Sequence, residues 1–223
     1  MRFTVCLADQ RSDEWRAARC GRLTGSRAGD MLATIKSGEA AARRDYRLQL
    51  VCERLTGQPQ DDVFVNAAMQ RGIDCEPLAF AAYESLTGQV VHRSGFLASV
   101  DHLMGCSLDG HVDDFAGILE CKCPKSATHL KYLRDGGVPK EHLPQITHNL
   151  LVTGADYCDF FSWDDRFPVD LQTFLVRVTR ADVDLKDYET KALAFLAEVE
   201  RDYQAIRTTS DLPTVLKEAV HAV

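Results

Sequence analysis

The amino-acid sequence predicts an α/β protein in which helices flank a central mixed β-sheet. Up to residue 88, apolar residues recur at helical spacing between capping signals. After residue 88 the apolar residues alternate every second position, as they do in strands, and helical spacing then returns. With 223 residues, of which 45% are apolar, the chain is long enough for one large domain with a sizeable core.

Capping signals predict three helices in the N-terminal part of the chain. Ser12 is an N-cap candidate followed by two acidic residues, so a helix is expected from there to about Gly21. A short helix is expected over residues 24–32, and a longer one over residues 39–56. Gly57 follows the longer helix at the position where a left-handed cap usually stands.

Four further helices are expected on either side of the strands. Residues 66–87 have the pattern of a long helix, with a kink at Pro77 because proline removes a backbone donor. Two shorter helical patterns cover residues 126–134 and 139–153. Residues 181–206 carry the apolar stripe of a long amphipathic helix.

Five segments show the two-residue period of strands, and they cover residues 89–99, 102–112, 117–123, 157–163 and 171–179. The first three follow one another closely enough to predict an antiparallel meander. The order of helices, then strands, then helices favours one α/β domain over two modules.

The charge of the chain is unevenly distributed. The formal net charge is −7. Residues 1–54 hold 11 Lys and Arg against 7 Asp and Glu, whereas residues 55–223 hold 15 against 26. A basic N-terminal part and an acidic remainder are compatible with DNA bound on one face only, although asymmetry of this size also occurs without function.

Composition also bears on the compartment. The sequence has no apolar run of the length that spans a membrane, and its first residues lack the apolar stretch of a signal peptide, so a cytoplasmic protein is expected. The eight cysteines form no C-x-x-C pair and no zinc-finger or iron–sulfur spacing. We therefore expect reduced thiols.

The most informative ionisable residues lie within residues 105–124, GCSLDGHVDDFAGILECKCP. Glu120 and Lys122 are two positions apart on an expected strand, so their side chains point to the same face, while Cys121 points to the other. Asp109 lies on the preceding strand. Two carboxylates and an ammonium group in this arrangement are the minimum needed for metal-assisted cleavage of a phosphodiester.

Such cleavage requires that charge on the phosphate be neutralised and that water be activated, and Mg²⁺ can do both. Mg²⁺ prefers oxygen ligands, which Asp109, Glu120 and the backbone carbonyl of Cys121 can supply. Lys122 would orient the attacking water or offset charge in the transition state. A plainer interpretation stays open, because Asp109-Gly110 is also a common hairpin turn and Glu-x-Lys a common exposed ion pair.

Further blocks of residues stand in a fixed order over residues 13–165. They are Glu14-Trp15-Arg16 with Arg19, Gly21, Thr24 and Ser26; Gly72 with Glu76, Tyr83, Glu84 and Gly88; residues 106–110 with residues 119–124; and Pro144-Gln145 with Val152-Thr153. In order and approximate spacing, these blocks resemble the phage lambda exonuclease type of nuclease, in the YqaJ-like viral recombinase family of the PD-(D/E)xK superfamily.

The resemblance implies a PD-(D/E)xK restriction-endonuclease-like core, with a central mixed sheet flanked by helices. It implies a single lambda-exonuclease-like nuclease domain over residues 1–223. Within that domain, residues 1–57 would be a helical part that contacts the 5′-phosphate and DNA, residues 58–180 the catalytic core, and residues 181–223 a C-terminal helix and tail.

The resemblance also implies two further residues at the catalytic site. Glu76 would be a third acidic group near the metal, reaching in from its helix. Gln145 would hydrogen-bond near the attacking water or the substrate phosphate. The family often has a second glutamine two residues later, and here that position is Thr147.

Four more residues match positions that bind DNA in the family. Arg19 and Ser26 would form a pocket for a terminal 5′-phosphate, a role that suits the planar fork of arginine and a hydroxyl at a helix start. Lys36 would reach into a groove of the duplex. Met69 would place an apolar wedge against the terminal base pairs.

Together these implications describe a Mg²⁺-dependent 5′→3′ exonuclease acting on the ends of double-stranded DNA. It would release mononucleotides and leave a 3′ single strand, with two Mg²⁺ ions per site and with Mn²⁺ able to substitute. The implied partners are double-stranded DNA ends, a single-strand annealing protein and two further copies of the chain in a ring-shaped homotrimer, with no membrane.

Two alternatives remain open at this point. The same core would serve an endonuclease or a repair nuclease of the Cas4 kind, although the cysteine cluster of the latter is missing. A non-catalytic module that binds DNA ends or mediates recombination is the alternative of another class, and the intact Asp109, Glu120 and Lys122 count against it.

Overall fold

The strands of the computed structural model, which describes residues 2–60 and 67–209, form two four-stranded sheets. The first sheet has the order β1-β3-β4-β2, and its strands are β1 (Phe3–Cys6), β2 (Leu23–Thr24), β3 (Phe96–Ser99) and β4 (Met104–Ser107). The second has the order β5-β6-β7-β8, and its strands are β5 (Gly110–Val112), β6 (Gly117–Lys122), β7 (Tyr157–Trp163) and β8 (Thr173–Thr179). This second sheet is mixed, because β6 and β7 are parallel while its other pairs are antiparallel.

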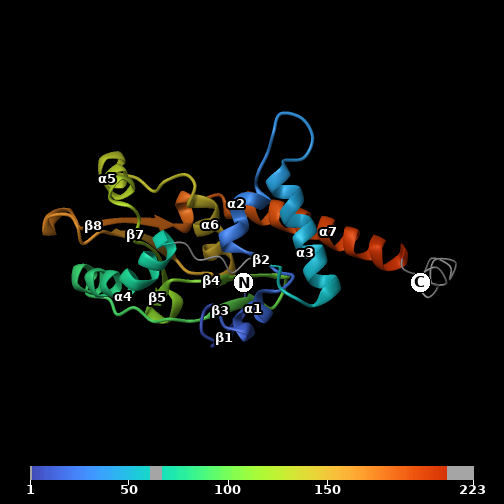
Figure 1. Ribbon diagram of the computed structural model, residues 1–223, viewed down its shortest axis with the longest axis horizontal. Helices are drawn as coiled ribbons and strands as arrows, with labels where there is room; N and C mark the ends of the chain where they lie inside the picture. The colour runs from blue at the N-terminus through green and yellow to red at the C-terminus, as the bar shows by residue number, and fades with distance from the viewer. Residues whose placement is uncertain (1, 61–66, 210–223) are drawn as a thin grey trace.

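Helices cover both faces of the second sheet. The helices are α1 (Asp13–Arg19), α2 (Ala28–Met31), α3 (Ala41–Thr56), α4 (Ala67–Thr87), α5 (Ser126–Asp135), α6 (Leu143–Thr153) and α7 (Leu185–Thr209). Figure 1 shows α4 and α5 on opposite sides of β7 and β8. No helix in the described residues is long and apolar enough to cross a membrane.

The alternation of side chains on β6 and β7 decides which helix each residue meets. On β7, Asp159 accepts a hydrogen bond from Tyr83 of α4, whereas Ser162 lies 2.8 Å from the imidazole of His129 of α5. On the neighbouring β6, Cys121 packs in the apolar cluster beneath α4. The next residues on either side of Cys121 therefore face α5 and α6.

The larger apolar core joins the two sheets to the N-terminal and C-terminal helices. Leu23, Leu50, Ile146 and Phe195 belong to it, and each is at most 1% exposed. The rings of Tyr46 on α3 and Phe195 on α7 stack 5.6 Å apart within it. Residues far apart in the sequence are thereby held in one packed body, which fixes the N-terminal segments against the second sheet.

The expected meander is wrong in one respect that matters for the site. The segment expected as one strand over residues 102–112 is two strands, β4 and β5, and they belong to different sheets. The chain passes from one sheet to the other at Leu108 and Asp109, where the Leu108 carbonyl accepts a hydrogen bond from the Gln10 side chain at 3.2 Å. Because that bond is made to a segment almost a hundred residues away, no local pattern could reveal the break.

The other strand boundaries differ for similar reasons. Of the expected strand over residues 89–99, only the part that pairs with β1 and β4 is regular, and His92 forms a single bridge to His111. Strands β1 and β2 were not expected from the sequence. Strand β1 is an exposed edge strand without alternating burial, and β2 has only two residues, so neither has the two-residue period of a half-buried strand.

Gly95, at the turn into β3, should not tolerate a side chain. Its φ is +70°, and a Cβ built there would lie 2.1 Å from the carbonyl oxygen of Cys6. We expect Gly95→Ala to lower the free energy of unfolding by about 2–4 kcal/mol, because backbone strain and overpacking add. Gly38→Ala is the matched control, since Gly38 has φ +82° with no atom within 4 Å and should lose only about 1 kcal/mol. Urea unfolding measures both, and equal losses would contradict the steric explanation.

Candidate active site

The hairpin of β5 and β6 brings the acidic cluster together. Asp109 directly precedes β5, and its Oδ2 accepts a hydrogen bond of 2.7 Å from the backbone N–H of Cys121 on β6. Gly110 pairs with Leu119 across the hairpin, which sets the register. Asp109 is therefore held opposite Glu120 by main-chain pairing rather than by flexible side chains alone.

Lys122 lies between the two carboxylates. Its Nζ is 3.8 Å from Oδ2 of Asp109 and forms an ion pair with Oε1 of Glu120. The other oxygen of Glu120 accepts a hydrogen bond of 2.8 Å from Nε2 of Gln145 on α6. Glu120 is completely buried, so these contacts are what keep its charge inside the protein.

The electrostatics of the cluster follow from this crowding. Burial raises the pKa of Asp109 to about 6, with Lys122 opposing the rise and Glu120 adding to it. Burial alone would lower the pKa of Lys122, but the adjacent Glu120 and Asp109 carboxylates raise it above its ordinary value. Near neutral pH the ammonium group is therefore fully charged, whereas Asp109 passes through its protonation midpoint about one pH unit lower.

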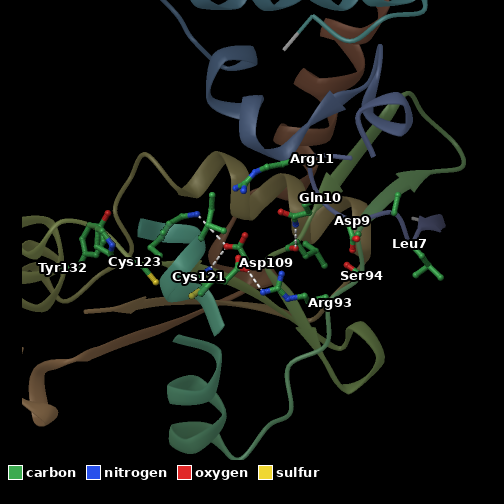
Figure 2. Close-up of a pocket in the computed structure, with 18 residues that line it drawn as sticks. Leu7, Asp9, Gln10, Arg11, Arg93, Ser94, Asp109, Cys121, Cys123 and Tyr132 are labelled. Carbon is green, nitrogen blue, oxygen red and sulfur yellow. Dashed lines mark hydrogen bonds and ion pairs between the residues drawn. The ribbon is translucent and has the colours of Figure 1, made fainter. Parts of the chain in front are cut away.

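A cavity of about 720 Å³ opens in front of this cluster (Figure 2). It is lined by the N-terminal segment over residues 7–11, by Glu76 of α4, by Arg93, and by Asp109 and Lys122. The carboxylate of Glu76 accepts a hydrogen bond of 2.5 Å from Nη2 of Arg93. Burial raises the pKa of Glu76, the Arg93 charge opposes that rise, and the Asp109 charge adds to it.

The donor set suits a hard divalent cation. Asp109, Glu120 and Glu76 offer carboxylate oxygens. The negative charges of Asp109 and Glu120 repel each other, and a bound cation would offset that repulsion. Among the described residues, no three His, Cys, Asp or Glu side chains already stand at ligand distance from one point. Instead, Lys122 forms an ion pair with Glu120, and Arg93 forms one with Glu76. These acidic residues would therefore bind a cation only when the two basic side chains move away.

Arg19 is the last residue of α1 and contacts the end of β4. Its guanidinium stacks 4.1 Å from the centre of the Trp15 ring and donates a hydrogen bond of 3.3 Å to the hydroxyl of Ser107. Ser26 is exposed, and its hydroxyl lies 3.5 Å from that of Thr24. Arg19 and Thr24 line a shallow pocket that also holds three further arginines, namely Arg16, Arg22 and Arg27.

Lys36 and Met69 lie apart from these groups. Lys36 is exposed on the loop between α2 and α3, which projects from the body of the molecule (Figure 1). Met69 belongs to the first turn of α4, and its side chain lies outside the described residues. Thr147, at the position of the second family glutamine, turns back to donate a hydrogen bond of 2.7 Å to the carbonyl of Leu143.

The structure adds two cavity residues that the sequence did not suggest, Arg11 and Arg93. Neither belongs to a motif, and only the folded chain brings them to Asp109. The N-cap residue Ser12 predicts that α1 begins directly after Arg11. It gives no sign that this segment packs beside Leu108 and Asp109, which the hydrogen bond from Gln10 to Leu108 reveals.

Comparisons with known proteins agree with this architecture. The sequence profile described as YqaJ-like viral recombinase domain matches residues 14–156. A search of curated proteins found no match. An alkaline exonuclease from Laribacter hongkongensis, LHK-Exo, is 38% identical, with 89% of this chain and 98% of that chain covered and a TM-score of 0.80. The structure of LHK-Exo in complex with dAMP is likewise 38% identical, with 91% and 100% covered and a TM-score of 0.81.

A more distant structure shares the fold alone. The phage-related exonuclease from Haemophilus somnus 129PT is 11% identical, with 85% of this chain and 96% of that chain covered and a TM-score of 0.63. The mixed sheet with helices on both faces is thus the architecture of these exonuclease structures.

Proposed function

Because this chain belongs to the YqaJ-like viral recombinase family, we propose that it is a metal-dependent deoxyribonuclease, a 5′→3′ exonuclease acting on double-stranded DNA. The observation that carries the proposal is the convergence of Asp109 and Lys122 at the wall of one open cavity, with the buried Glu120 paired to Lys122 behind them. A buried carboxylate and a half-buried one that share one ammonium group are not needed for stability, since apolar residues would fill such a place at lower cost. A catalytic use explains their retention.

We propose Asp109, Glu120, the Cys121 carbonyl and Glu76 as the groups that hold Mg²⁺, with Mn²⁺ able to substitute and two ions per site. When bound, the cation supplies positive charge to the phosphate and activates water for attack. The side chain of Gln145 holds Oε2 of Glu120 by a hydrogen bond, and Oε1 of Glu120 forms the ion pair with Lys122, so the orientation of the carboxylate is fixed.

Lys122 acts in this proposal as a charged donor. Its raised pKa means that the ammonium group keeps its proton near neutral pH, so it is a poor proton acceptor. It would instead donate hydrogen bonds to the attacking water and the scissile phosphate, and so stabilise negative charge that grows in the transition state.

The direction of digestion would come from the arginine-lined pocket. Arg19 and Ser26 would bind the terminal 5′-phosphate, Lys36 would contact a groove of the duplex, and Met69 would press on the terminal base pairs. Release of mononucleotides leaves a 3′ single strand, and the dAMP complex of the Laribacter relative supports a mononucleotide product. We further propose a ring-shaped homotrimer, a single-strand annealing protein as partner and action in the cytoplasm, where free thiols such as the eight of this chain stay reduced.

The proposal is tested with three DNA substrates and two conditions. Linear duplexes with 5′-phosphate or 5′-hydroxyl ends, and a covalently closed circle, are incubated with Mg²⁺ or with EDTA. Mononucleotides released only from phosphorylated linear ends, and only with Mg²⁺, are the expected result. Nicking of the circle would indicate an endonuclease, and binding without cleavage a recombination mediator.

Replacement of Arg19 should remove the preference for phosphorylated ends. We expect Arg19→Ala to lower the cleavage rate on 5′-phosphate duplexes by about tenfold to a hundredfold, because the arginine would bind the doubly charged terminal phosphate. The slower rate on 5′-hydroxyl duplexes should not change, because those ends carry no terminal phosphate. Arg19→Lys should recover part of the loss, because the charge stays but the planar fork is gone. Arg134→Ala is the control, as Arg134 is an exposed arginine whose ion pair in the described part of the chain is with its neighbour Asp135. A preference that survives in Arg19→Ala would place the terminal pocket elsewhere.

A further inference from the structure

We propose that Arg93 is a phosphate-binding residue that exchanges partners: it rests on Glu76 in the free protein and moves to a DNA phosphate when a cation takes Glu76. The inference rests on the proposed nuclease function and adds to it a residue and an order of events. It also names the two ligands that would compete for Glu76, a guanidinium and a divalent cation.

The contact between Arg93 and Glu76 leaves most of the arginine available. Only Nη2 of Arg93 reaches the carboxylate, at 2.5 Å, and the side chain is 61% exposed. The guanidinium lies 5.2 Å from the centre of the Phe80 ring on α4, which supports it from one side. An arginine with its remaining N–H donors facing an open cavity is prepared to bind a second anion.

The same contact keeps Glu76 from serving as a metal ligand. Glu76 and Asp109 line the same cavity, and the Asp109 charge raises the pKa of Glu76. While Oε2 of Glu76 accepts from Arg93, that oxygen is not free for a cation. A cation bound beside Asp109 would repel the guanidinium and attract the carboxylate, so the pair would separate.

Once released, Arg93 has one suitable partner. Arg93 lines the same cavity as Asp109 and Lys122, and its charge lowers the pKa of Asp109. A DNA strand entering the cavity brings phosphates to that place. Guanidinium and phosphate match in charge and geometry, so the exchange leaves neither group without a partner.

Arg11 supports a phosphate site in this cavity from independent evidence. Its φ is +76°, a left-handed conformation that is strained in any residue other than glycine, asparagine or aspartate. Figure 2 shows Arg11 and Arg93 reaching into the cavity from different sides of Asp109. Among the described residues, no ion pair engages Arg11. Strain that presents an unengaged cation to an open cavity is expected where an anion binds.

The test measures two affinities in the absence of cleavage. Binding of Mn²⁺ to the DNA-free protein is followed by calorimetry, and binding of a 5′-phosphorylated duplex is followed by fluorescence anisotropy in Ca²⁺. For Arg93→Ala we expect Mn²⁺ to bind about threefold to tenfold more tightly, because Glu76 no longer has a competing partner, and the duplex to bind about tenfold more weakly. Tighter Mn²⁺ binding together with weaker duplex binding supports the exchange of partners, because a merely structural role for Arg93 would weaken both affinities or leave both unchanged.

Further variants keep the test decisive. Arg93→Lys should keep the duplex within about threefold of wild type while loosening the hold on Glu76, and it covers the case that Arg93→Ala folds poorly. Arg11→Gly should weaken duplex binding and leave the melting temperature equal or higher, because the strain is removed. Arg2→Ala is the control, an exposed arginine paired with Asp101 outside the cavity.

The outcomes separate the inference from the function on which it rests. If wild type binds and cleaves the duplex but Arg93→Ala leaves both affinities unchanged, or weakens both, the exchange is rejected and the nuclease function stands. If wild type neither binds nor cleaves, the proposed function fails, and the exchange fails with it.

Discussion

Replacement of Lys122 by alanine should lower the rate of DNA cleavage by about a thousandfold or more while leaving duplex affinity within a few-fold of wild type. The ammonium group is the only basic group that contacts both Asp109 and Glu120 among the described residues, and it faces the cavity where the scissile phosphate would lie. A charged donor aimed at developing negative charge contributes rates of this order. Affinity should persist because most duplex contacts would lie elsewhere.

Single-turnover cleavage at saturating enzyme and Mg²⁺ measures the Lys122→Ala effect, because it excludes product release. Lys125→Ala is the matched control, an exposed lysine three positions later at the start of α5. A Lys122→Ala variant that cleaves at the wild-type rate would remove this residue from the mechanism. Equal losses in both variants would indicate a general charge effect instead.

Replacement of Asp109 by asparagine should abolish metal-dependent cleavage and yet stabilise the metal-free protein. The cleavage loss follows from removing a proposed ligand charge. The stability gain follows from the pKa of Asp109, which burial raises to about 6 in the folded protein from an ordinary value of 3.8. Between these values the folded chain holds a proton that the unfolded chain has released, so stability falls as the pH rises through this window.

The sign of the Asp109→Asn effect can be checked by pH. The variant should gain little at pH 4, where the aspartate is largely protonated in both states, and on the order of 1 kcal/mol above pH 7. Thermal unfolding in EDTA at several pH values measures this difference in stability. Added Mg²⁺ should make wild type the more stable protein, because only wild type is stabilised by the cation.

Asp101→Asn is the control variant. The Arg2 side chain lowers the pKa of Asp101, so Asp101→Asn should not gain stability at neutral pH. Identical pH profiles for Asp109→Asn and wild type would contradict the buried-charge explanation.

Local periodicity predicted the part of the site that a single hairpin builds. The alternation of β6 places Glu120 and Lys122 on one face and Cys121 on the other, as the spacing indicates. The long helices were also predictable, because their apolar stripes and glycine caps are local signals. The kink expected at Pro77 stays a prediction, as does the division of the chain into three parts.

What the sequence could not show depends on contacts between distant segments. The break between β4 and β5 is set by Gln10 and by the pairing of β5 with β6, not by a turn signal at Leu108. Arg11 and Arg93 reach Asp109 only because the two sheets pack together, and their neighbours in the sequence carry no chemical motif. Resemblance to a family suggested Glu76 and Arg19, whose roles stay predictions, but it could not suggest a residue outside the shared motifs.

Ser107 joins two regions that are otherwise separate. Its hydroxyl accepts hydrogen bonds from Nε1 of Trp15 and from Arg19, and it is the last residue of β4, two residues before Asp109. One hydrogen bond and the two peptide units between residues 107 and 109 therefore connect the Arg19 guanidinium to Asp109. Under the proposed function, a shift of the Arg19 guanidinium on binding a DNA end should therefore also displace Asp109.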